Sequence, residues 1–297
     1  MISNKKGFNL GQLVLNLFFI IVCLAYVLPM LLLVSISISS ENSIREFGYN
    51  LIPKVIDMAA YRQIFKSPQM LLNAYKVTII YTVITTLLAI VVMGMMAYPL
   101  SRKNCKFRNF VSFYIFFTML FNGGLAPTYI IISKYMHLNN TIWVYIFPAL
   151  VNAWSIIIIR TYFQGLPPDL VEAAKIDGAS EIFILFKIIF PLSTPVFATI
   201  GFNVALAKWN DWNTALIYID DTTLYSLQYM LQRILREAEF LQKAATEGGV
   251  SDFVNQEIPT ESMRYAMAIL AAGPMMFVFP FFQKYFTKGL TIGAVKG

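Results

Sequence analysis

The chain carries a short polar stretch, Glu172-Ala173-Ala174-Lys175-Ile176-Asp177-Gly178, between two long apolar segments. Ile188 and Pro191 follow it, the second at the start of the next apolar segment. The apolar segments on either side decide the fold class. The polar stretch between them indicates which kind of membrane protein the chain is.

Apolar residues dominate the rest of the sequence. Of the 297 residues, 58% are hydrophobic and 13% are charged, and the mean hydropathy is +0.63. A water-soluble domain of this length cannot bury so many apolar side chains, so lipid must cover part of the surface. Because the apolar runs are continuous and do not alternate with polar residues, they predict helices rather than the strands of a membrane barrel. The expected fold class is all-α, a polytopic membrane protein.

Six stretches are long enough, and sufficiently free of charge, to cross the roughly 30 Å hydrocarbon core as helices. They cover approximately residues 13–38, 72–100, 110–132, 141–163, 191–214 and 264–286. The third stretch contains Asn122-Gly123-Gly124 and Pro127, residues that interrupt helices. We interpret them as the outer end of a helix rather than as a broken pore helix.

The distribution of basic residues predicts the orientation. Residues 101–108 hold four cations in eight positions, which places this loop in the cytoplasm by the positive-inside rule. Six crossings then put both termini in the cytoplasm and segments 39–70 and 215–263 outside. This topology accounts for the net charge of +7 without nucleic-acid binding. Ser226 to Ala245 has the pattern of an amphipathic helix, which either packs on the bundle or docks a partner.

The polar stretch lies in a predicted cytoplasmic hairpin, residues 165–191. Asp169 is suited to the first turn of one helix, Gly178 permits a tight turn, and Ser180 caps a second helix. The second helix is apolar on nearly every side, so we expect it to be buried against the membrane helices. The first helix exposes the carboxylate of Glu172. It either binds a partner through that group or lies in the lipid headgroups.

The spacing in the hairpin resembles the coupling-loop motif of permease subunits in bacterial ATP-binding-cassette importers. That motif has Glu-Ala-Ala, a Gly, an Ile and Leu-Pro, and this chain has Phe190-Pro191 in place of Leu-Pro. Residues 172–180 are similar to the version found in carbohydrate importers. Two other regions agree: Asn73 with residues 97–102 resembles the two ends of the first core helix, and residues 283–297 resemble the tail of the second permease subunit, the counterpart of the smaller maltose-transporter membrane subunit.

The resemblance implies the type I importer permease fold and a division of the chain. Residues 1–70 would be the first transmembrane helix and an extracytoplasmic segment, residues 71–290 the core permease domain, and residues 291–297 a cytoplasmic tail. It also implies a heterodimeric pore formed with a second permease subunit in the bacterial cytoplasmic membrane. Two copies of a cytoplasmic ATPase and an extracytoplasmic solute-binding protein would complete the importer.

The expected cargo is an oligosaccharide or a polysaccharide fragment, because the long segment before the last span resembles the branch that handles such substrates. The chain contains no Gly-x-x-x-x-Gly-Lys-Ser/Thr phosphate loop. We therefore expect ATP and Mg on the partner ATPase, no cofactor or metal on this chain, and no enzymatic activity of its own.

The resemblance also assigns coupling roles within the hairpin. Glu172 and Asp177 would make polar contacts with the ATPase, Ala173 and Ala174 would pack against it, and Gly178 would form the turn. ATP-driven closure of the ATPases would then move the hairpin and tilt the helices.

Five residues are candidates for the substrate path. Trp209, Asn210 and Trp212 combine aromatic faces with hydrogen-bonding groups, a combination suited to sugars, although Trp also anchors helices at the membrane interface. Asn152 and Asn203 are polar residues inside spans, which tend to face the interior of a bundle or to bond between helices.

Other function classes have little support in the sequence. A stand-alone secondary transporter would carry charged residues in the middle of its spans, and this chain has almost none away from the span ends. A membrane enzyme would need a nucleophile with its base or a set of metal ligands, and the chain has a single histidine, His137. A permease for a solute other than a sugar is the remaining alternative.

Overall fold

The structure, a computed structural model, describes residues 10–247 and 259–294. Apart from one isolated antiparallel bridge between Ser39 and Ile56, the regular structure of these residues is helical. The chain divides into two compact units, which we consider separately. Unit 1 contains the residues up to 68 together with 233–272, and unit 2 contains 69–232 together with the residues from 273 onward.

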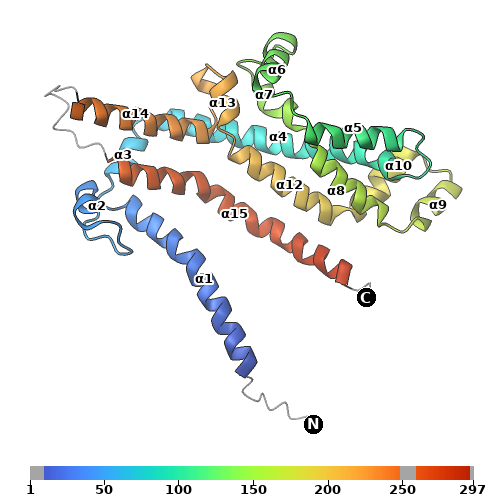
Figure 1. The fold of residues 1–297 in the computed structure, drawn as a ribbon, viewed down its shortest axis with the longest axis horizontal. Coiled ribbons are helices and arrows are strands. Elements are labelled where there is room, and N and C mark those ends of the chain that lie inside the picture. The colour runs from blue at the N-terminus through green and yellow to red at the C-terminus, as the bar shows by residue number, and fades with distance from the viewer. Residues whose placement is uncertain (1–9, 248–258, 295–297) are drawn as a thin grey trace. The chain divides into compact units, whose positions relative to one another are not determined.

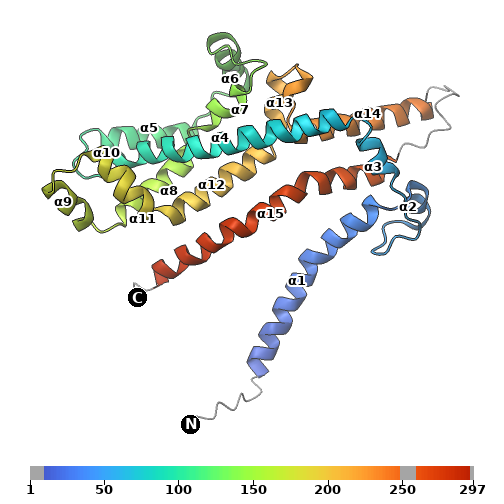
Figure 2. The same ribbon diagram turned by 180° about the vertical axis from the view of Figure 1, so that it is seen from behind.

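The helices are shown in Figures 1 and 2. The first part of the chain forms α1 (Leu10–Ser37), α2 (Glu41–Phe47), α3 (Ala59–Ile64), α4 (Pro68–Ser101), α5 (Arg108–Leu120), α6 (Leu125–Ile130), a π-helical turn (Ile131–Tyr135), α7 (Trp143–Ile146) and a 3-10 turn (Phe147–Ala149). The rest forms α8 (Ala153–Gln164), α9 (Asp169–Ile176), α10 (Glu181–Ile184), a π-helical turn (Leu185–Ile189), α11 (Phe190–Leu192), α12 (Thr194–Trp209), α13 (Asn213–Tyr218), a 3-10 turn (Thr222–Leu224), α14 (Leu227–Glu247) and α15 (Thr260–Ala294).

Three helices of the described residues are individually long and apolar enough to cross a bilayer: α1, α4 and the portion of α15 up to Gln283. Three bent pairs pass the same test when each is taken together, with bends of 113° between α5 and α6, 49° between α7 and α8, and 81° between α10–α11 and α12. The prediction of an all-α membrane protein is confirmed. The structure supports three spans, or up to six if each bent pair is one span.

The bends lie where the sequence interrupts the helices. The predicted span 110–132 is two helices, because α5 ends at Leu120 and the side chain of Asn122 accepts a hydrogen bond from Gly124 N in the following turn (2.9 Å). In the predicted span 141–163, the side chain of Asn152 caps α8 by accepting from Ser155 N (2.9 Å). A helix that restarts with its own cap does not continue the preceding one.

In unit 2, α4 packs against α8, α12 and the hairpin that joins them. The shared core consists of buried apolar side chains, among them Ala89, Met93, Ala97, Ile156, Ile159, Phe163, Ile184, Ile189, Val196, Phe197 and Ile200. Because Gly94 of α4 has no side chain, the rings of Phe190 and Phe197 approach its backbone closely. A Cβ at this position would lie 2.6 Å from Cζ of Phe190 and 3.2 Å from Cζ of Phe197, so any larger residue must displace the aromatic rings.

The N-terminal half of α4 is fixed by polar contacts. Tyr81 stacks on Tyr145 with ring centroids 4.3 Å apart, and its hydroxyl donates to the carbonyl of Lys208 at 3.0 Å. Thr78 Oγ1 accepts a hydrogen bond from Leu227 N, the first residue of α14, at 2.8 Å. The predicted amphipathic helix over 226–245 is therefore confirmed as α14, and its first turn is bonded to α4.

In unit 1, helix α2 holds the start of the last helix, α15. The carboxylate of Glu41, which is only 6% exposed, accepts hydrogen bonds from the backbone N–H groups of Glu261 and Ser262, both at 3.3 Å. These are free donors in the first turn of α15, where the helix dipole also favours a negative charge. Hydrogen bonds with Tyr265 and Glu261 raise the pKa of Tyr49 to about 12.

Candidate functional site: a hairpin helix at one end of the bundle

The predicted hairpin folds from local signals. Asp169 opens α9, where a carboxylate is favoured in the first turn. Gly178 has a φ of +79°, a conformation that side chains resist, and its N–H closes the helix on the carbonyl of Lys175 at 3.0 Å. Ser180 then caps α10 by accepting from Phe183 N at 3.3 Å. The predictions of a first helix, a turn at Gly178 and a cap at Ser180 are all confirmed.

Helix α9 lies with α10 at one end of α4, α5, α8 and α12 (Figures 1 and 2). Its inner face is anchored by Val171 and Ala174, which are 5% and 8% exposed. Ala174 therefore packs against its own chain rather than outward. The other four residues assigned to coupling are exposed, and they are Glu172, Ala173, Asp177 and Gly178.

One apolar side chain on the outer side of α9 stands out. Ile176 is 86% exposed, although the seven residues before it form a helix with a well-buried inner face. This exposed aliphatic side chain lies beside Asp177 and one turn after Glu172, so the exposed surface of α9 offers both an apolar contact and charge.

The second half of the hairpin is helical but buried on one side only. Ile184, Leu185 and Ile189 are 5% exposed or less and join the core of unit 2. Ile182 and Phe183 are 72% and 52% exposed. The predicted burial of this helix against the membrane helices is therefore confirmed for one of its faces, and the other face is exposed in the chain by itself.

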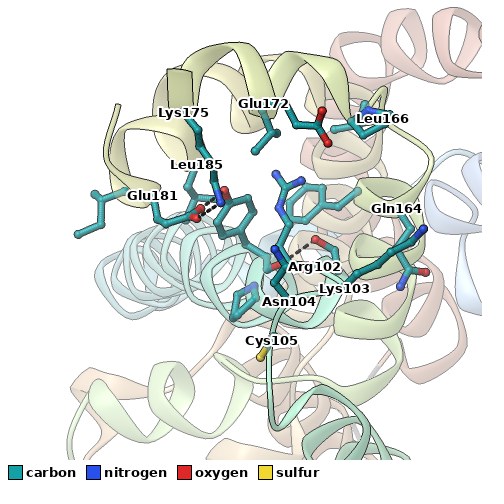
Figure 3. A pocket seen from close by; sticks show the side chains of 17 residues that line it. Arg102, Lys103, Asn104, Cys105, Gln164, Leu166, Glu172, Lys175, Glu181 and Leu185 are labelled. Carbon is teal, nitrogen blue, oxygen red and sulfur yellow. Dashed lines mark hydrogen bonds and ion pairs between the residues drawn. The ribbon is translucent and has the colours of Figure 1, made fainter. Parts of the chain in front are cut away.

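A carboxylate from α10 joins the hairpin to α4. Glu181 Oε1 lies 2.6 Å from Nζ of Lys175 in α9, and Glu181 Oε2 accepts a 2.6 Å hydrogen bond from the hydroxyl of Tyr98 in α4. The guanidinium of Arg102 lies over the Tyr98 ring, 4.6 Å from its centroid. Figure 3 shows Lys175 and Glu181 pointing toward one another. We call these four residues the Glu181 cluster.

The Glu181 cluster lines a cavity of about 840 Å³ between α9, the end of α4 and the end of α8 (Figure 3). Charged groups of both signs face it, including Lys103 and Glu172, and Phe163, Leu166 and Leu185 give it apolar walls. Val171 and Ala174 still join α9 to the core of unit 2, so α9 borders the cavity and is packed on the bundle at the same time.

The candidate substrate-path residues occupy different environments. Trp209 is buried (5% exposed), whereas Asn203 and Trp212 are exposed. Asn210 is exposed, and its side chain bonds to the carbonyl of Leu206 and to Gln228. Asn152 caps α8, a local role that accounts for a polar residue in an apolar segment without requiring a substrate.

The sequence pattern did not identify the Glu181 cluster. Tyr98 and Arg102 lie at the end of the first core helix, in the stretch that resembles the importer family, but no spacing rule connects them to Glu181, 83 residues after Tyr98. Among the described residues, no group of three or more His, Cys, Asp or Glu side chains is placed to hold a metal ion.

Comparison with known proteins identifies the family. Residues 90–292 match the family described as "Binding-protein-dependent transport system inner membrane component". The chain is 37% identical over 272 residues to protein LplC of Bacillus subtilis, covering 91% of this chain and 90% of that protein. It is 34% identical over 281 residues to the polygalacturonan/rhamnogalacturonan transport system permease protein YtcP of the same organism, covering 95% of each.

A solved structure has the same fold. A chain of a bacterial ABC transporter involved in the import of the acidic polysaccharide alginate superposes with a TM-score of 0.77 at 27% sequence identity, covering 96% of this chain and 99% of that chain. The family is one of transport system inner membrane components and YtcP is named as a transport permease, a non-enzymatic kind of membrane subunit. The resemblance seen in the coupling-loop motif is thereby confirmed, and the chain belongs to the family of binding-protein-dependent transport system inner membrane components.

Proposed function

We propose that this chain forms half of the translocation pore of an ATP-driven importer and couples to its ATPase through α9. The observation that carries the proposal is the exposed surface of α9, where the side chains of Glu172, Ile176 and Asp177 are accessible and Gly178 forms the turn that ends the helix. A second permease subunit, two ATPase copies and a solute-binding protein would complete the transporter. ATP and Mg would be bound by the ATPases, and both termini of this chain would lie in the cytoplasm.

In this proposal the hairpin transmits force by rigid-body motion. Val171 and Ala174 fix α9 from within, and the Glu181 cluster ties the hairpin to the end of α4. Movement of a bound ATPase would therefore reach α4 directly, and through the shared core it would reach α8 and α12.

Replacement of Glu172 tests the coupling role. We expect Glu172→Lys to place a cation where the partner meets a carboxylate, with a loss of about 2–5 kcal/mol in ATPase binding and a tenfold or greater fall in transport. The measurement is recovery of the ATPase with the purified membrane subunits, together with uptake in reconstituted vesicles. Glu46→Lys, the same charge reversal at an exposed position of α2, is the matched control. Unchanged uptake and ATPase recovery in Glu172→Lys would refute the coupling role of α9.

For the substrate, we propose an oligosaccharide or polysaccharide fragment. The names of YtcP and of the structural relative both specify acidic polysaccharides, so oligouronates are the first compounds to examine. The assay is ATP hydrolysis by the reconstituted transporter with its binding protein, and we expect stimulation by a uronate or neutral oligosaccharide of several residues. Stimulation only by a different class of solute would leave the permease assignment intact and overturn the sugar assignment.

A further inference from the structure

Two arginines from packed helices of unit 2, Arg108 and Arg160, each have a buried Nε atom that makes no hydrogen bond within the described part of the chain, as does Arg102 of the Glu181 cluster. Arg108 is the first residue of α5 and Arg160 lies one turn before the end of α8. Their Nε atoms are buried and have no hydrogen-bond acceptor among the described residues. Neither side chain takes part in an ion pair with a described carboxylate.

The helices bring these two cations together. Helix α5 packs against α8, and the buried side of α5 passes through Ile115 and the partly buried Val111. Arg108 lies three and seven residues before these positions, so it extends the same side of α5 toward α8. Arg160 lies four residues after Ile156 and three before Phe163, two buried residues of the same core, so it faces the packed side of α8.

The helix dipole of α5 adds to the positive charge around Arg108. The amino-terminal end of α5 carries the positive end of the helix dipole, where an acidic residue is favoured and a cation is not. The first turn of α5 has no acidic residue, and Phe107 before it supplies no side-chain cap. The dipole of α8 favours Arg160 near its carboxyl end but gives its Nε no acceptor.

We propose that Arg108 and Arg160 bind the phosphate of an anionic phospholipid at the predicted cytoplasmic boundary of the membrane. Two guanidinium groups offer donors in a planar arrangement suited to phosphate oxygens. Basic pockets between membrane helices on the cytoplasmic side bind anionic headgroups in this way. The outer side of α5 exposes Phe110 and Phe113, which are 72% and 65% exposed and give acyl chains an apolar surface next to the headgroup site.

Native mass spectrometry of the full-length chain in mild detergent tests this site, with phosphatidylglycerol or phosphatidylcholine added. We expect the wild-type chain to retain phosphatidylglycerol, and Arg108→Gln/Arg160→Gln to bind it about tenfold or more weakly. Lys106→Gln/Lys187→Gln removes the same charge from two exposed lysines and should retain the lipid. If the double arginine variant folds poorly, Arg108→Gln alone, at a helix end, should show the same loss to a smaller degree.

Three other results of these measurements would contradict the proposed lipid site. Equal retention of phosphatidylglycerol by the arginine and lysine variants would show that the pair is not a binding site. Displacement of the lipid by inorganic phosphate at equal concentration would assign the site to a free anion instead. If the arginine variant keeps its lipid but, when co-expressed with a second membrane subunit, fails to co-purify it as the wild-type chain does, a protein carboxylate pairs with these arginines instead. None of these readouts depends on the proposed ATPase coupling.

Discussion

Glu181 is an exposed carboxylate with two short contacts. Its side chain is 55% exposed and that of Lys175 is 47% exposed, so solvent screens their attraction and the pair adds at most about 1 kcal/mol to stability. The contact with Tyr98 is different in kind, because it joins the hairpin to a separate helix. We therefore expect Glu181 to hold α9 in position and to contribute little to the stability of the fold.

At this scale we predict that Glu181→Gln lowers coupling more than stability. The neutral amide loses the ion pair with Lys175, so α9 is less firmly held against α4. The melting temperature should change little, since the loss is at most about 1 kcal/mol, while substrate-stimulated ATP hydrolysis and uptake should fall together. Glu237→Gln removes an exposed helical ion pair with Arg233 and serves as the control. An equal effect on transport in both variants would contradict a specific role for Glu181.

Among the elements, the hairpin shows what the sequence predicts well. Its helix boundaries, its turn and its cap depend on neighbouring residues, and the signals at Asp169, Gly178 and Ser180 predicted them correctly. The sequence did not predict which side of α9 is buried. Ala173 and Ala174 are adjacent and identical, yet one is exposed and the other is buried, because the contact with α8 and α10 selects one side of the helix.

The difference between local signals and tertiary contacts also applies to the candidate substrate residues and to the predicted spans. Asn152 has a polar side chain in an apolar segment, and only the structure shows that it caps a restarted helix. Hydropathy over 110–132 and 141–163 predicted apolar segments correctly, but its average over a whole segment does not give the bends of 113° and 49° at the interruptions. Tyr98 and Glu181 meet through tertiary packing, which no local pattern encodes.

At the scale of the element we predict that Gly178 controls the hairpin turn. A β-branched residue resists the φ of +79°, so Gly178→Val should cost about 1–2 kcal/mol and displace α9 relative to α10. Asn tolerates this conformation better, so Gly178→Asn should be milder. A Cβ at Gly178 meets no atom within 4 Å, so crowding is excluded as a cause. Recovery of the ATPase with each variant is the measurement, and equal losses for Val and Asn would contradict the conformational explanation.

At the scale of the whole molecule, contacts within unit 1 join helices from the beginning and the end of the chain. Glu41 caps the start of α15, 220 residues further along, and Arg264 of α15 contacts Glu239 of α14 at 2.8 Å. Contacts of this kind form only when most of the chain has been made. They give the segments between the apolar helices of unit 1 a defined structure that hydropathy alone does not predict.

We predict that Glu41→Leu destabilises unit 1 selectively. The substitution leaves the N–H groups of Glu261 and Ser262 without their buried acceptor, at a cost of about 1–3 kcal/mol. Limited proteolysis should then cut near residues 39–70 sooner than in the wild type, while cleavage within unit 2 is unchanged. Glu46→Leu, at an exposed position of the same helix, is the control. Accelerated cleavage in unit 2 as well would show that the two units do not unfold separately.

The length of α4 has a mechanical consequence. Its 34 residues span about 51 Å at 1.5 Å per residue, well beyond the roughly 30 Å hydrocarbon core. Near one end, Tyr98 bonds to the hairpin, and toward the other, Thr78 and Tyr81 bond to α14 and to Lys208. Pivoting such a rod by about 10° carries its far end through about 9 Å, from the same helical rise. In the proposed coupling, α4 would therefore act as a lever that converts a small rotation at the hairpin into a large displacement at its other end.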